Sequence, residues 1–89
     1  MTKKVSEGFG TSQAAVTTTA SKIVAGQSGI DTVTIYNIGS ADCYLGNTSG
    51  VLTSTGFKLA AGAAITMETT RDIYAIGSGA TTLCILVEG

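Results

Sequence analysis

The sequence contains no histidine, no tryptophan and no proline, and few of its residues are charged. Without histidine there is no Ser–His or Cys–His nucleophile pair and no histidine-ligated zinc. Cys43 and Cys84 are too far apart in the chain for a zinc knuckle, and no glycine-rich phosphate loop of a known pattern is present. We therefore expect neither an enzyme nor a protein with a metal site or a cofactor.

The scarcity of charge limits the partners that the chain can attract. Five basic and six acidic residues give a net charge of −1, and no cluster of lysine and arginine offers an electrostatic surface for nucleic acid. Charged residues make up 12% of the chain and hydrophobic ones 44%, whereas an average protein has about 25% charged residues. With 89 residues the chain can bury only a small core. We expect that much of its surface faces another protein.

Long apolar runs are also missing. No segment approaches the roughly 20 apolar residues that a membrane helix needs, and no apolar stretch follows Lys3 and Lys4, so we expect no membrane segment and no signal peptide. Synthesis in a cytosol is the simplest expectation. In a reducing compartment Cys43 and Cys84 are expected to be small buried hydrophobic residues, and a disulfide between them would need Cα atoms within about 7 Å.

What the chain does contain is short stretches of threonine, valine and isoleucine separated by glycine. Alternation of apolar and polar residues, or β-branched runs, predicts strands. The predicted strands are one or two within 14–24, then 31–38, 43–46, 57–59, 64–68, 73–76 and 81–88. The turn between the second and third of these groups predicts that 31–38 and 43–46 form a hairpin. Gly62 lies in a tight turn and is a candidate for positive φ.

This pattern predicts an all-β fold, a small antiparallel β-sandwich of jelly-roll-like type with seven or eight short strands. Residues 14–89 form the sandwich domain, and residues 1–13, which lack periodicity, form a flexible N-terminal arm. The last strand is apolar on both faces, with Leu83, Ile85 and Val87 on one side and Cys84 and Leu86 on the other. We expect a neighbouring chain to cover one of these faces.

Some polar and aromatic residues are candidates for specific roles. Asp31, Asp42 and Asp72 lie at turns or strand starts, where such side chains usually accept hydrogen bonds from nearby backbone amides. Aromatic and aliphatic residues on strands or on the arm are candidate contacts to a partner. The candidates for partner binding are Phe9, Val5, Tyr36, Tyr44 and Leu86.

The order of the motifs between Val33 and Glu88 carries a resemblance. The motifs are Val33-Thr34-Ile35-Tyr36-Asn37-Ile38-Gly39-Ser40, Cys43-Tyr44-Leu45-Gly46, Gly56-Phe57-Lys58-Leu59-Ala60-Ala61-Gly62-Ala63-Ala64-Ile65 and Ile73-Tyr74-Ala75-Ile76-Gly77-Ser78-Gly79, followed by the last strand. Together they resemble the small β-sandwich structural proteins of tailed bacteriophages, which include capsid decoration (cement) proteins and head or tail accessory modules. Residues 1–30 lie outside the resemblance.

The resemblance implies a virion protein that binds and stabilises the outer head shell, with the major capsid protein or another virion protein as its partner. It also implies a homo-oligomer, for which we expect a trimer, and many modest contacts that add through multivalency. A tail, baseplate or fibre accessory module is the alternative. A third possibility is a carbohydrate-binding module that uses Tyr36, Tyr44 or Tyr74.

Overall fold

The computed structural model describes residues 9–26 and 32–89, and these residues form strands joined by turns and loops. The eight strands are β1 (Phe9–Val16), β2 (Ser21–Val24), β3 (Thr32–Asn37), β4 (Cys43–Gly46), β5 (Phe57–Leu59), β6 (Ala64–Met67), β7 (Ile73–Gly77) and β8 (Thr81–Glu88). The all-β prediction is confirmed, and most strand bounds agree with the alternation in the sequence to within a residue or two.

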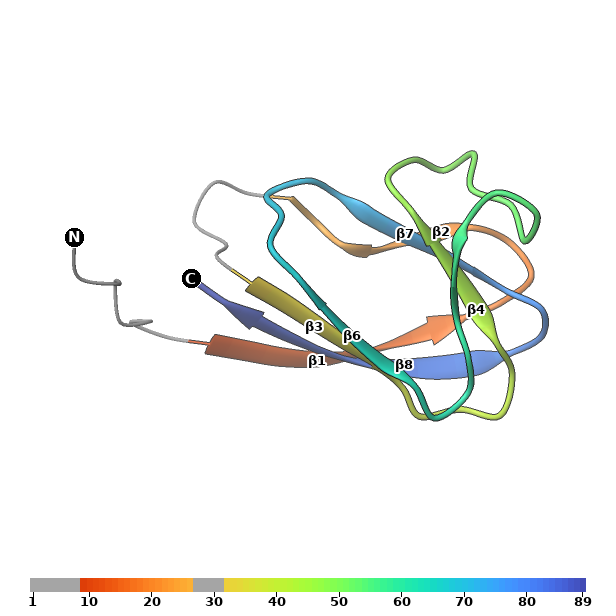
Figure 1. Ribbon diagram of the computed structural model, residues 1–89, viewed down its shortest axis with the longest axis horizontal. Helices are drawn as coiled ribbons and strands as arrows, with labels where there is room; N and C mark the ends of the chain where they lie inside the picture. Colours follow the sequence, from red (N-terminus) through yellow and green to blue (C-terminus); the bar gives the residue numbers. More distant parts are fainter. Residues whose placement is uncertain (1–8, 27–31) are drawn as a thin grey trace.

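The strands form two four-stranded antiparallel sheets packed face to face (Figure 1). One sheet has the order β1-β8-β3-β6 and the other β2-β7-β4-β5. Among the described strands, β4 and β5 are the one pair that is consecutive in the sequence and also adjacent in a sheet. This interleaved order is that of an eight-stranded jelly roll, which confirms the predicted sandwich.

The core lies between the two sheets. Alternation along β3 and β8 points Val33, Ile35, Leu83 and Ile85 inward, and each is at most 2% exposed. The opposite sheet contributes a second set of buried residues, which includes Val24, Cys43, Leu45, Leu59, Ile73 and Ala75. The inward and outward faces of the last strand therefore agree with the prediction from its sequence.

The predicted hairpin between residues 31–38 and 43–46 is wrong. β3 pairs with β6 and β8, whereas β4 pairs with β5 and β7 in the other sheet. Residues 38–42 therefore cross from one layer to the other (Figure 1). Turn-forming residues between two strands show that the chain changes direction, but they do not show whether the next strand pairs or crosses over.

The structure also moves the boundary of the predicted arm. Residues 9–13 of the expected arm 1–13 belong to β1, where Phe9 pairs with Glu88 and Gln13 pairs with Cys84. Their composition gave no strand signal, because this half of β1 lacks β-branched residues other than Thr11. Pairing with the long strand β8 supplies the order instead. Residues 1–8 lie outside the described part of the chain.

A turn and the cysteines complete the fold. Gly62 has a φ of +83°, as predicted, and Ala63 N–H closes the turn by donating to Ala60 O at 2.9 Å. Cys43 and Cys84 are both free thiols, one buried in the core and one half-buried on an outer face. Within the described residues no helix is long and apolar enough to cross a membrane.

Candidate docking surface

The outer surface of the β1-β8-β3-β6 sheet is the strongest candidate for a functional site. Directly paired residues of neighbouring strands share a face, so the registers place Thr11, Leu86 and Thr34 in one row. Gln13, Cys84 and Tyr36 form the next row. We call these six residues the β8 face. They come from three strands that are widely separated in the sequence.

The β8 face is hollowed along its centre. The residues of the β8 face, with Ser12 and Ile85, line an open depression of about 370 Å³. Cys84 and Leu86 are half-buried, while Tyr36 is 46% exposed. An apolar strip flanked by small polar side chains can accept an apolar side chain of another protein.

Polar atoms on this surface already bond to one another. The Gln13 amide donates to Cys84 Sγ at 3.6 Å, and the hydroxyls of Thr34 and Thr66 lie 2.9 Å apart. Among the described strand residues that point outward from this sheet, only Glu88 is charged, and it accepts a hydrogen bond from the Thr32 hydroxyl at 3.4 Å. The surface therefore favours an uncharged partner over an anionic one.

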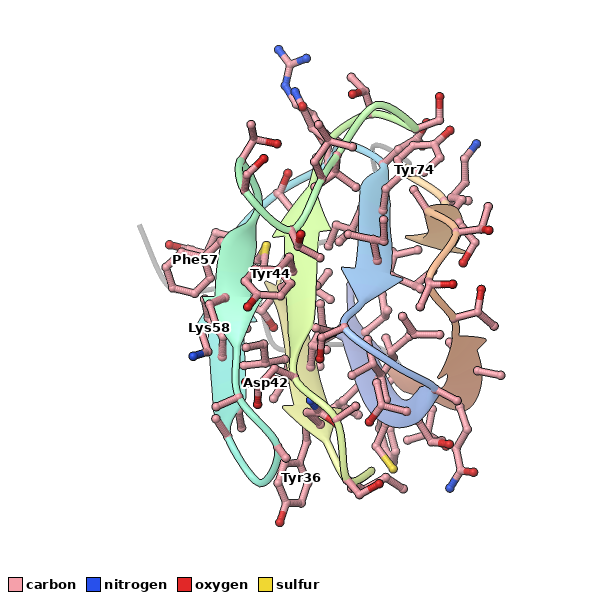
Figure 2. The ribbon with its side chains drawn as sticks, turned by 90° about the vertical axis from the view of Figure 1, so that its right-hand side faces the viewer. Tyr36, Asp42, Tyr44, Phe57, Lys58 and Tyr74 are labelled. Atoms are coloured by element: carbon pink, nitrogen blue, oxygen red, sulfur yellow. The ribbon has the colours of Figure 1, made fainter. Side chains whose placement is uncertain are left out.

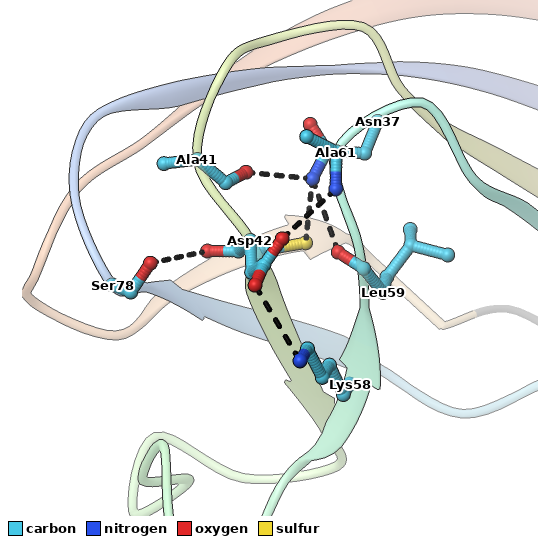
Figure 3. A network of polar contacts seen from close by, with 8 residues as sticks. Asn37, Ala41, Asp42, Lys58, Leu59, Ala61 and Ser78 are labelled. Atoms are coloured by element: carbon cyan, nitrogen blue, oxygen red, sulfur yellow. Dashed lines mark hydrogen bonds and ion pairs between the residues drawn. The ribbon is translucent and has the colours of Figure 1, made fainter.

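The opposite sheet carries the ion pairs. Lys22 Nζ lies 3.3 Å from Asp72 Oδ2, and it also lies 5.8 Å from the centre of the Tyr74 ring. Lys58 Nζ lies 3.6 Å from Asp42 Oδ2 (Figures 2 and 3). Of the charged residues in the described strands, Lys22 and Lys58 therefore lie on the opposite sheet, and Glu88 is the one on the sheet that carries the β8 face.

The carboxylates of these pairs also hold loops in place. Asp72 accepts a hydrogen bond from Gly26 N–H at 2.7 Å, and Asp42 accepts one from Ala61 N–H at 3.0 Å. The pKa of Asp72 is lowered, first by the hydrogen bond from Gly26 N–H and second by the Lys22 ammonium group. Asp72 in turn raises the pKa of Lys22. The expectation of hydrogen bonds to neighbouring amides is therefore wrong for Asp42 and Asp72, since both reach distant loops, and Asp31 lies outside the described residues.

The predicted partner-binding residues do not form one cluster. Tyr36 and Leu86 both lie on the β8 face, and Phe9, at the start of β1, is 72% exposed. Tyr44 lies on the outer surface of the opposite sheet, where it helps to line a shallow depression of about 590 Å³ with Leu52. Val5 lies outside the described residues.

The three tyrosines do not make a shared platform either. Tyr44 and Tyr74 project from the β2-β7-β4-β5 sheet, whereas Tyr36 projects from the other sheet. Figure 2 shows Tyr36 well apart from both. The structure gives no support to a carbohydrate site built from all three rings.

Sequence reasoning missed half of the β8 face. Leu86 and Cys84 were visible from the alternation of the last strand, but their neighbours Thr11, Gln13 and Thr34 were not. Only the pairing of β1 and β3 with β8 brings these residues together. In the part of the chain that the structure describes, no group of three or more histidine, cysteine, aspartate or glutamate side chains is placed to hold a metal ion.

Comparison with known proteins identifies solved structures of similar fold. No protein-family model and no curated protein sequence matches the chain. Among solved structures, the stem and receptor-binding domain of the spike protein P1 from bacteriophage PM2 is similar, with a TM-score of 0.68, 13% identity and 89% of this chain covered. The chain spans only 32% of that spike structure.

Two other solved structures have the same fold. A pilus subunit of Bacillus endospore appendages has a TM-score of 0.56 at 18% identity, with 91% of this chain and 83% of that chain covered. A cupin superfamily protein from Desulfitobacterium hafniense has a TM-score of 0.63 at 8% identity, with 99% and 73% covered. These proteins differ in their roles, so the likeness establishes the jelly roll and does not by itself select a function.

Proposed function

We propose that this chain is a structural protein of a bacteriophage virion, a decoration protein that binds and stabilises the outer head shell through the β8 face. The observation that carries the proposal is the depression over Cys84 and Leu86, an uncharged and largely apolar surface that no described residue of the chain covers. Burial of such a surface against a shell protein stabilises both partners without a charge requirement.

Three further observations support this role. The β8 face is built on strands of a sandwich, so it is rigid and presented without a change in fold. The resemblance between Val33 and Glu88 is to phage structural proteins, and the same fold occurs in the PM2 spike. The proposed activity is binding and not catalysis, in keeping with the absence of histidine from the sequence.

The test uses Cys84 as a reporter of docking. We expect Cys84 to be alkylated readily in the isolated protein and to be protected after the protein binds shells assembled from the major capsid protein of the same phage. Cys43 is buried and serves as the internal reference. Equal labelling of Cys84 in free and shell-bound protein would show that the β8 face is not the contact.

Variants test the same contact without alkylation of Cys84. Leu86→Glu places a charge in the depression and should abolish binding to shells, while Thr18→Glu, at an exposed site near the opposite sheet, should bind as the wild type does. Far-ultraviolet circular dichroism checks that both variants keep their strands. Wild-type binding by Leu86→Glu would reject the proposed surface.

An accessory module of a tail, baseplate or fibre is the second candidate, because the PM2 protein of similar fold is a spike. Mass spectrometry of purified heads and purified tails distinguishes a location on the head shell from one on the tail. Recovery of the chain with the tail fraction alone would overturn the assignment to the head shell.

A further inference from the structure

The strand β1 is an edge strand that lacks the usual protection against pairing. β1 and β6 are the edges of one sheet, and β2 and β5 are the edges of the other. An edge strand has backbone N–H and C=O groups free along one side, and natural proteins protect such strands by shortness, by lysine or proline, or by a bulge. β1 is eight residues long and pairs with β8 without a break in register from Phe9 to Val16.

The other three edges are protected. β2 has four residues, includes Lys22 and has a register shift between Lys22 and Val24. β5 has three residues, one of them Lys58, and β6 has four residues with Glu68 directly after it. β1 is the exception, because its sequence Phe-Gly-Thr-Ser-Gln-Ala-Ala-Val contains neither charge nor proline, and most of it is exposed.

We propose that β1 is an interface between two copies of this chain, in which the two β1 strands pair antiparallel about a two-fold axis. The result is a continuous sheet of eight strands with the two β8 faces on the same side. The neutral sequence favours a second copy as the occupant, because a two-fold axis places the residue on the axis opposite its own copy, where two like charges would repel each other.

The side chains select a register for this pairing. A two-fold axis normal to the sheet pairs residues of the same face, so Ser12 at the axis places Thr11 opposite Gln13 and Phe9 opposite Ala15. Phe9, which is 72% exposed, then packs against the smallest outward-facing side chain of β1. An axis at Gln13 instead places Phe9 opposite Thr17, beyond the end of the strand. We therefore assign the axis to Ser12.

Strand pairing over about seven residues buries less area than most stable dimers bury. The dimer should consequently be weak, and the mass from light scattering should rise with protein concentration from that of one chain towards that of two. This inference is independent of the proposed role in a virion, and its experiments use the isolated full-length chain alone. Either proposal can fail without the other.

Disulfide trapping tests both the interface and the register, in a Cys84→Ala background. Directly opposed residues of antiparallel strands have Cα atoms about 4.5–5.5 Å apart, within the range of a disulfide. Ser12→Cys should therefore form covalent dimers under mild oxidation. Thr11→Cys and Gln13→Cys should not do so singly, but a mixture of the two should cross-link, because these residues face each other across the axis.

The control for disulfide trapping is Ala64→Cys, at an exposed position of the β6 edge. Ser12→Cys must cross-link faster than Ala64→Cys, and the dimer that it traps must keep the strand content of the wild type by circular dichroism. Equal rates for the two variants would overturn the proposal.

Charge repulsion gives a second and independent test. Ser12→Lys places two ammonium groups opposite each other at the axis and should leave the protein monomeric, while Ala64→Lys should associate as the wild type does. A wild-type mass of one chain at every concentration, or a trimer that Ser12→Lys leaves intact, would also overturn the interface.

Discussion

The hydroxyl of Thr81 donates a hydrogen bond of 2.7 Å to Oδ1 of Asn37, and both residues are buried. This bond joins the start of β8 to the end of β3. The amide nitrogen of Asn37 donates to Ala41 O at 2.9 Å and to Leu59 O at 3.1 Å (Figure 3). One buried side chain thus fixes the crossing between the two sheets at the end of β3, and every polar atom of that side chain has a partner.

Thr81→Val should destabilise the protein by about 1–2 kcal/mol, because it leaves Asn37 Oδ1 with only the Gly39 N–H as a donor. Thr81→Ser keeps the hydroxyl and is the matched control, and it should lose less than the valine variant. Urea unfolding followed by circular dichroism measures both. Equal stabilities of the valine and serine variants would mean that the hydroxyl contributes nothing.

Asn37→Ala should lower the free energy of unfolding by more, about 3–4 kcal/mol. The variant leaves the carbonyl groups of Ala41 and Leu59 and the hydroxyl of Thr81 without the hydrogen-bond partner that Asn37 provides. The loss should appear as a lower midpoint of urea unfolding with an unchanged slope, which reports stability at constant exposed surface. A loss as small as that of Thr81→Val would show that water satisfies these groups in the variant.

Close packing around the same crossing leaves no space for a side chain at Gly39. A Cβ atom on Gly39 would collide with Thr81 Oγ1 and lie 2.6 Å from Thr82 N, so Gly39→Ala should destabilise the protein by about 1–3 kcal/mol. Gly10→Ala is the control, because nothing lies within 4 Å of its added carbon. Thermal unfolding of both variants tests the prediction, and equal melting temperatures would contradict it.

These contacts show which parts of the structure local sequence patterns can reveal. Alternation identified the buried residues Val33, Ile35, Leu83 and Ile85, because each depends only on which way its own strand faces. Asn37, however, stands in the sequence only as a polar residue near the end of the predicted strand 31–38. Its role depends on Leu59 and Thr81, 22 and 44 residues away, which no local pattern connects.

Strand pairing was hidden for the same reason. β1 and β8 pair across the whole length of the chain, and β3 pairs with β6 and β8 and not with the next strand. The sequence of residues 9–13 has little strand propensity and is ordered by its partner strand. The outward-facing half of β8 was predictable, but the depression that it forms with Thr11, Gln13 and Tyr36 required the fold.

The two thiols should differ sharply in reactivity. Burial first, and the Asp42 charge second, raise the pKa of Cys43 to about 11, so roughly one molecule in a thousand carries the thiolate at about pH 8. Cys84 is half-buried on the β8 face. A chromogenic disulfide reagent should therefore detect one thiol in the native protein and two in denaturant. Cys84→Ala should leave none in the native state, and a rapid native reaction of that variant would contradict the burial of Cys43.

Stability should depend on pH through Asp72. Its carboxyl pKa is lower in the folded protein than its ordinary value of 3.8, so the unfolded chain takes up a proton first as the pH falls. The contribution to stability is complete above that ordinary value and is lost as the pH falls through the lower folded pKa. For Lys22, whose pKa is raised above 10.5, the contribution is complete below that value and is lost at higher pH.

Asp72→Asn isolates this effect, because asparagine can still accept the hydrogen bond from Gly26 N–H but carries no charge. The wild type should be more stable than this variant at pH 7 in urea unfolding, and the difference should shrink below about pH 4. Lys22→Gln should remove part of the acid-side dependence and leave the part that depends on the Gly26 hydrogen bond, which is the largest single cause of the lowered pKa of Asp72. Added salt should weaken the Lys22 part alone, since that ion pair is exposed to solvent. A difference between wild type and Asp72→Asn that stays constant from pH 7 to pH 2 would show that the charge of Asp72 does not stabilise the fold.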